Sequence, residues 1–213
     1  LAVAGTVALT THGRGNATLV NDAGLNLAAS TVGGALSATA ATENIADTGA
    51  LAITGTSTFI TGADGSNIIL DSSSNAFSNA VTLQAGAGDE TFGNITFVDS
   101  AAVDIDSSPS GDGDLFINAG PDGVVGGNLS ITATTGNITD SNALMIGGTS
   151  SFTTSANNAT IALDTTTNAF TGAVTITTND DSGADADVTI DGGTTALVLA
   201  ASTIDGDLTV TSG

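Results

Sequence analysis

The residues with the clearest chemical potential are acidic and lie in glycine-rich turns. One such segment covers residues 85–94 and reads AGAGDETFGN. It is similar to a single copy of the Gly-Gly-x-Gly-x-Asp nonapeptide that binds calcium in parallel β-helices. Asp89 and Glu90 would supply carboxylate oxygens, and loop carbonyl groups would complete the coordination shell. The segment therefore predicts a calcium site or, alternatively, a solvated acidic turn.

A second acidic segment covers residues 179–187 and reads NDDSGADAD. It gathers Asp180, Asp181, Asp185 and Asp187 within nine residues. Carboxylates this close repel one another unless a cation screens them, so calcium binding is one interpretation and an acidic surface loop is the other. A third segment, DIDSSPSGDGD at 104–114, allows the same two interpretations.

Catalytic chemistry finds little support in the sequence. His12 and Arg14 are the only His and Arg, they lie in the turn-like stretch THGRGN, and the chain has no Cys. A lone His needs a partner within hydrogen-bond distance to catalyse anything. Paired Asp residues on a parallel β-helix would suit a polysaccharide-cleaving enzyme, but such sites also need basic or several aromatic residues to hold the sugar. Because Trp, Tyr and Lys are absent, we expect a protein that is not an enzyme.

Thr-x-Thr pairs raise the question of ice binding as one further function. Such pairs occur in ITATT (131–135) and VTITT (174–178), and on a flat solenoid face they can bind ice. They do not recur at one fixed spacing in the sequence. We therefore interpret these Thr residues as ordinary strand residues, for which Thr has a high propensity.

The composition narrows the class of partner. The chain has 22 acidic residues and one basic residue, which gives a formal net charge of -21. Binding to nucleic acid or to an anionic membrane surface needs Lys and Arg, so neither is expected. No stretch reaches the roughly 18 apolar residues of a membrane-spanning helix, so we expect no membrane insertion. Asp, Asn, Gly, Ser and Thr are the main polar residues and favour turns over helix interiors.

The chain repeats itself. Residues 34–84 and 127–177 share 27 identical residues in 51 ungapped positions, 93 residues apart. A second relation aligns LNLAASTVGGAL (25–36) with LVLAASTIDGDL (197–208), 172 residues apart. We expect one continuous domain over residues 1–213, with copies at 34–120 and 127–213, excerpted from a longer chain.

Short alternating units fill each copy and predict β-strands. Apolar-x-apolar triplets recur every 8 to 17 residues, each bounded by Gly, Asn, Asp or Ser. Strands this short in near-identical copies favour a β-solenoid over a sandwich or a barrel, since each coil of a solenoid rests on one like itself. With three strands and about 20 residues per coil, the sequence predicts about ten coils and no significant helix. Phe59, Phe77, Phe152 and Phe170 would fill the corners.

Three phrases carry a resemblance to a known family. NITDSNALMIGGTSSFTT, ATIALDTTTNAFTGAVTIT and ALVLAASTIDGDLTVTSG resemble the repeats of large bacterial surface proteins of the filamentous-haemagglutinin-like and autotransporter-like kind. The resemblance covers essentially the whole chain. It implies a right-handed parallel β-helix that is exported and located outside the cell or on its surface.

Two functional hypotheses follow. The first is a structural, non-catalytic segment of an extracellular or cell-surface repeat protein, acting as an adhesin stalk or filament rod. The second is a β-solenoid module that binds calcium or carbohydrate through its acidic loops. The expected partners are further repeats or like subunits, joined end to end or laterally, and host or surface glycans.

Overall fold

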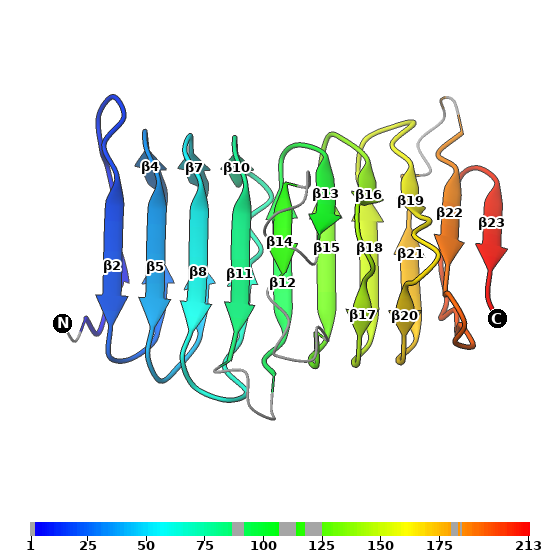
Figure 1. Cartoon of the computed structure of the whole chain (residues 1–213). Coiled ribbons are helices and arrows are strands. Elements are labelled where there is room, and N and C mark those ends of the chain that lie inside the picture. The colour runs from blue at the N-terminus through cyan, green and yellow to red at the C-terminus, as the bar shows by residue number, and fades with distance from the viewer. Residues whose placement is uncertain (1–2, 87–91, 107–113, 118–124, 180–182, 184) are drawn as a thin grey trace.

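The computed structural model is a parallel β-solenoid, as the repeats predicted. It describes residues 3–86, 92–106, 114–117, 125–179, 183 and 185–213. All the strand pairs in this part of the chain are parallel, and the coils stack side by side along one long axis (Figure 1). The described residues contain no helix, which agrees with the composition. Consequently no described helix is available to span a membrane.

Two wide sheets form the opposite faces of the solenoid. The eight-stranded sheet has the order β1 (Thr6–Val7), β3 (Leu25–Leu27), β6 (Ile45–Asp47), β9 (Ile68–Leu70), β12 (Ile95–Asp99), β15 (Leu129–Ala133), β18 (Ser150–Thr154) and β21 (Val174–Thr177). The ten-stranded sheet has the order β2 (Ala17–Asn21), β5 (Leu36–Ala40), β8 (Ser57–Thr61), β11 (Val81–Ala85), β14 (Leu115–Ile117), β13 (Val103–Asp106), β16 (Ile138–Asp140), β19 (Ile161–Leu163), β22 (Val188–Asp191) and β23 (Leu208–Thr211).

Two narrow sheets lie at the edges between the wide ones. The first side sheet contains β4 (Ser30–Val32), β7 (Leu51–Ile53) and β10 (Ala76–Phe77). The second side sheet contains β17 (Met145–Ile146) and β20 (Ala169–Phe170). Figure 1 shows the first at the top edge of the stack and the second at the bottom edge.

The solenoid has about eight turns, so the expectation of about ten coils was slightly wrong. The reason is coil length. Equivalent residues in the eight-stranded sheet are separated by 23, 27, 34 and 21 residues from β6 to β18, whereas only the first two steps, β1 to β3 and β3 to β6, have the assumed 20. The extra residues lie in the connections, because the strands themselves stay in register.

The core consists of apolar files that run along the axis. One file on the eight-stranded sheet contains Leu25, Ile45, Ile68, Ile95 and Leu129, each paired in register with the next. All are at most 2 % exposed. Burial of each such side chain stabilises the fold by about 1.5–3 kcal/mol. The four Phe residues predicted at corners are also buried, and they meet edge to face as the pairs Phe59–Phe77 and Phe152–Phe170. The corner prediction was wrong for Phe59 and Phe152, which lie in the middle of the wide-sheet strands β8 and β18.

Equivalent strands of the two copies, 93 residues apart, lie on opposite faces of the solenoid. Leu36 lies in β5 of the ten-stranded sheet, whereas its counterpart Leu129 lies in β15 of the eight-stranded sheet. The strands β6 and β16 exchange sheets in the opposite direction, and the side sheet moves from one edge to the other. The second copy is therefore related to the first by about half a turn around the long axis, in addition to the translation.

An irregular coil in the middle produces this half turn. After β12 the chain enters β13 in the ten-stranded sheet without forming a strand of the first side sheet. It then forms β14, which lies in the same sheet between β11 and β13. Because β13 and β14 follow one another on the same face, the chain gains half a coil at this point. Each later strand therefore lies on the face opposite to that of its counterpart in the first copy. We call residues 99–117 the switch coil, of which 99–106 and 114–117 are described.

Glycine is needed where neighbouring coils approach most closely. A Cβ at Gly127 would lie 2.2 Å from the carbonyl oxygen of Gly93 in the preceding coil. The same close approach links Gly148 to Gly127 and Gly172 to Gly148. Each of these glycines lies just before a strand of the eight-stranded sheet. A side chain at that position would separate two coils that must hydrogen-bond to each other.

We expect Gly127→Ala to lower the free energy of unfolding by about 1–3 kcal/mol, because the added methyl group forces the backbone of adjacent coils apart. Urea unfolding followed by circular dichroism measures the change. Gly5→Ala is the matched control, since a Cβ at Gly5 has no atom within 4 Å. Equal stability of the two variants would contradict the close-packing explanation.

Candidate functional site

An asparagine ladder runs along the edge of the eight-stranded sheet. It consists of Asn44, Asn67, Asn94 and Asn128, each of which directly precedes a strand. The Oδ1 atom of each accepts a hydrogen bond from the backbone N–H of the equivalent residue in the next coil, at 2.7–2.9 Å; the last acceptor, Asn128, receives Thr149. The ladder therefore ties five coils together outside the sheet hydrogen bonds.

Two buried Asp–Asn pairs close the corners that follow the wide sheets. Asn75 is 0 % exposed; its Nδ2 donates to Asp47 Oδ2 at 2.6 Å and its Oδ1 accepts from Leu51 N at 2.8 Å. The second copy repeats the arrangement with Asn168, which donates to Asp140 Oδ2 at 2.6 Å. Each pair links two neighbouring coils, because Asp47 and Asp140 end β6 and β16, whereas the Asn residues follow β9 and β19, the next strands of the same sheets. We call them the Asp–Asn clamps.

Burial changes the acidity of three carboxyl groups. Loss of hydration raises the pKa of Asp47, Asp99 and Asp140 above the usual 3.8. Hydrogen bonds from the protein oppose this effect, from Asn75 and two backbone N–H groups for Asp47 and from Asn168 and two for Asp140. Desolvation is the largest contribution in each case, so folding shifts the protonation equilibrium of these groups toward the neutral form.

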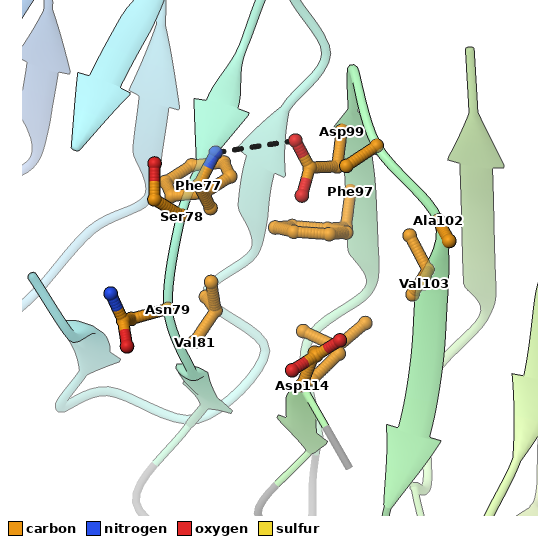
Figure 2. Close-up of a pocket in the computed structure, with 11 residues that line it drawn as sticks. Phe77, Ser78, Asn79, Val81, Phe97, Asp99, Ala102, Val103 and Asp114 are labelled. Carbon is orange, nitrogen blue, oxygen red and sulfur yellow. Dashed lines mark hydrogen bonds between the residues drawn. The ribbon is translucent and has the colours of Figure 1, made fainter. Parts of the chain in front are cut away.

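A cleft of about 230 Å³ opens beside the switch coil (Figure 2). Its walls come from the β10–β11 segment, the β12–β13 segment and the start of β14, and the lining residues are Phe77, Ser78, Asn79, Val81, Phe97, Asp99, Ala101, Ala102, Val103, Asp114 and Leu115. The cleft lies where the first side sheet ends at β10. Its origin is the missing side strand after β12, since Ala101 and Ala102 lead directly into β13.

Acidic and aromatic groups meet in this cleft. Asp99 is 5 % exposed and accepts a hydrogen bond from Phe77 N at 3.2 Å. Asp114 is exposed and lies at the other end of the cleft (Figure 2). The rings of Phe77 and Phe97 stack with centroids 5.3 Å apart, and Figure 2 shows them beside the Asp99 carboxyl group. The negative charge of Asp114 contributes to the raised pKa of Asp99, so the two carboxyl groups interact across the cleft.

Comparison with known proteins places the chain in a repeat family. The family model described as repeats of unknown function (DUF5649) matches residues 14–84 and 121–177. These two matches cover more than half of the chain. The chain belongs to the DUF5649 repeat family. Neither the curated proteins nor the solved structures contain a significant match.

The two matches to the DUF5649 repeat follow the internal duplication. They contain β5–β10 and most of β11 in the first copy and β15–β21 in the second, and the equivalent strands lie on opposite faces of the solenoid. Both Asp–Asn clamps lie inside the matched residues, and the second match begins just before the asparagine ladder reaches Asn128. The switch coil (residues 99–117) lies between the two matches, so the cleft combines walls from the repeat with residues outside it.

The predicted calcium ligands remain largely untested. Asp89, Glu90, Asp180 and Asp181 lie outside the described residues. Asp185 and Asp187 are both exposed, and Asp187 Oδ1 accepts a hydrogen bond from Asp207 N at 2.8 Å. Within the described part of the chain, no three His, Cys, Asp or Glu side chains are grouped to hold a metal ion. Asp187, which follows the second DUF5649 match, acts as a polar link between coils.

The third acidic segment also makes contacts between coils. Asp104 accepts hydrogen bonds from Thr139 Oγ1, at 3.0 Å, and from the Ser141 hydroxyl group. Asp106 is 0 % exposed and accepts from Asn142 Nδ2 at 3.0 Å. These carboxyl groups bind the side chains of the following coil.

Outward hydroxyl groups form two rows on the eight-stranded sheet. One row pairs Thr96, Ser130, Ser151 and Thr175 in register, and the other pairs Thr132, Thr153 and Thr177. Their sequence spacing varies, but the connections absorb the variation, so the irregular spacing was not a sound reason to discount a regular array. Any parallel stack with outward Thr and Ser gives such rows, and they assign no ligand by themselves.

The sequence signals for the clamps and the cleft differ. Asn75 and Asn168 could be found, because both repeat in the phrase Asn-Ala-Phe, although the sequence indicated only turn residues. Asp47 and Asp140 also recur 93 residues apart. The cleft gave no such signal, because the switch coil occurs once and its walls come from segments whose pairing the sequence did not reveal.

Proposed function

We propose that the chain is a structural, non-catalytic segment of an extracellular or cell-surface repeat protein, in which it acts as a stiff rod in an adhesin stalk or filament. The main support is the uninterrupted parallel pairing from β1 to β21 and from β2 to β23. Because each coil binds its neighbours through sheet hydrogen bonds, the asparagine ladder and the Asp–Asn clamps, bending would break several bonds at once.

Further features of the proposal concern winding and assembly. Right-handed winding is supported by the general preference of parallel strand crossovers for that hand. The resemblance to filamentous-haemagglutinin-like and autotransporter-like repeats supports export and a surface location. The outermost strand of the ten-stranded sheet, β23, exposes Leu208 and Val210 by 44 % and 43 %. Such an edge suits stacking against a further repeat or a like subunit.

A second candidate is a calcium- or carbohydrate-binding module. It is favoured by the four Asp residues within 179–187 and by a net charge of -21 with a single Arg, which attracts cations. In this candidate the metal would hold the acidic loops, and the solenoid would serve as their support.

Calcium removal distinguishes the two functions. For a rod held by its own hydrogen bonds, we expect the maximum dimension from small-angle scattering and the melting temperature to stay the same, within error, when EDTA replaces 2-fold excess calcium. Asp180→Asn/Asp185→Asn should behave identically to the wild type. A melting temperature that falls by several degrees on chelation, in the wild type only, would support the calcium-binding module instead.

A further inference from the structure

The cleft beside the switch coil contains negative charge that the chain itself cannot neutralise. Asp99 and Asp114 both line it, and Asp99 is nearly buried. The chain has no Lys and a single Arg, Arg14, which precedes β2. In the ten-stranded sheet, β2 is separated from β11 by three strand spacings, or about 14 Å. This exceeds the Debye length of about 10 Å in ordinary buffers. The chain therefore supplies no basic side chain to the cleft, and a cationic ligand would meet no positive charge there.

The residues that line the cleft favour an organic cation over a metal ion. Phe77, Phe97, Val81, Val103 and Leu115 provide apolar surface, and the two Phe rings stack at 5.3 Å. A metal ion such as Ca²⁺ needs six to eight oxygen ligands, whereas the described residues hold no group of three acidic or imidazole side chains. An organic cation can place its charge between the carboxylates and its apolar part against the rings, and aromatic faces also attract cations.

The size of the cleft limits the ligand to a small molecule. About 230 Å³ corresponds to the liquid volume of about seven water molecules. It lies below the 300–1,000 Å³ that is usual for drug-sized ligands. One ring or a short branched chain with a single ammonium group is of suitable size.

We propose that the cleft formed by β10–β11, β12–β13 and the start of β14 binds a small primary amine in its ammonium form, with the charge held between Asp99 and Asp114 and the apolar part against Phe77 and Phe97. This binding is independent of the rod function, since it uses the one irregular coil and leaves the regular stack intact. The raised pKa of Asp99 fits this arrangement, because an ammonium group would offset the charge that burial penalises.

The test uses benzylammonium as the probe and isothermal titration calorimetry with the full 213-residue chain at pH 7.5. Benzyl alcohol is the neutral control of similar shape. We expect the amine to bind, with an affinity that falls as salt is added, and benzyl alcohol to bind at least tenfold more weakly. No measurable amine binding, or equal binding of the two probes, would overturn the proposal.

Variants locate the site. Asp114→Asn and Asp99→Asn should each weaken amine binding at least tenfold, while Asp164→Asn, an exposed carboxylate in a distant coil, should leave it unchanged. Asp114 is exposed, so its variant is expected to fold even if Asp99→Asn does not. Unchanged affinity in Asp114→Asn, or an equal loss in Asp164→Asn, would show that general negative charge attracts the amine and would refute the cleft as its site.

Discussion

Asn75→Ala should lower the free energy of unfolding by about 3–5 kcal/mol. The substitution removes the donor to Asp47 Oδ2 and the acceptor for Leu51 N, and both partners are buried. An unpaired N–H group and a buried carboxylate without its strongest hydrogen bond then remain in the folded state. Water cannot replace Asn75 without opening the corner between neighbouring coils.

The second copy provides an internal repetition of this experiment. Asn168→Ala removes the donor to Asp140 and the acceptor for Leu144 N, so a similar loss is expected. The two clamps lie in different coils and share no partner, so their effects should add within about 0.5 kcal/mol. Urea unfolding of both single variants and the double variant measures this.

Asn79→Ala is the matched control for Asn75→Ala. Asn79 also donates from Nδ2 across coils, to Thr54 O at 2.7 Å, but the bond is exposed. Water can replace it, so a loss below about 1 kcal/mol is expected. If the Asn75 and Asn79 variants were equally stable, the clamps would contribute no more than surface hydrogen bonds, and the corners would be held by sheet pairing alone.

The sequence predicted the strands well because their inward residues alternate strictly. In β5, β8 and β11 every second residue is buried, and the same alternation is visible in the sequence. Parallel stacking followed from the near identity of the copies. The number of turns did not follow, since a connection can gain or lose residues without disturbing the register of the strands it joins.

The half-turn between copies could not be derived from the sequence. Leu36 and Leu129 are equivalent in every local respect, and both face the core. The sheet that each enters depends on how many strands precede it in the coil, and that number changes at β13 and β14. The sequence similarity between residues 25–36 and 197–208 corresponds to the same local contacts. Ser30 and Ser202 each donate from Oγ to the carbonyl group two residues earlier, and each Oγ accepts a hydrogen bond from a backbone N–H group of the previous coil.

In the sequence only the negative charge of the acidic residues is apparent, and this charge led to the prediction of calcium sites. The described carboxyl groups show a second use. Asp47 and Asp140 accept hydrogen bonds inside corners, and Asp187 accepts a backbone N–H group of the next coil. The Asp and Asn side chains have the same length, so an oxygen of either can accept a hydrogen bond from the neighbouring coil, although the two residues differ in charge. A sequence cannot show which Asp has a backbone N–H group within reach.

These carboxyl groups predict that the protein becomes more stable as the pH falls toward 3.8, the ordinary carboxyl pKa. Burial raises the pKa of Asp47, Asp99 and Asp140, so the folded protein binds protons more tightly than the unfolded chain. Their stabilising contribution is complete below the ordinary value of 3.8 and is lost as the pH rises through each raised pKa. Each unit of pKa elevation corresponds to about 1.4 kcal/mol.

The net charge acts in the same direction, because protonation reduces the mutual repulsion within a chain of charge -21. Urea unfolding at pH 5.0, 6.5 and 8.0 at constant ionic strength measures the trend, and the free energy of unfolding should be highest at pH 5.0. The Asp99→Asn variant separates the two causes: its amide can still accept from Phe77 N, so its stability should depend less on pH, while exposed Asp64→Asn, which influences none of the three raised pKa values, should keep the wild-type slope. A stability that rises with pH would mean that hydrogen bonds to the ionised carboxylates outweigh their desolvation, and the order of the two effects in the clamps would be reversed.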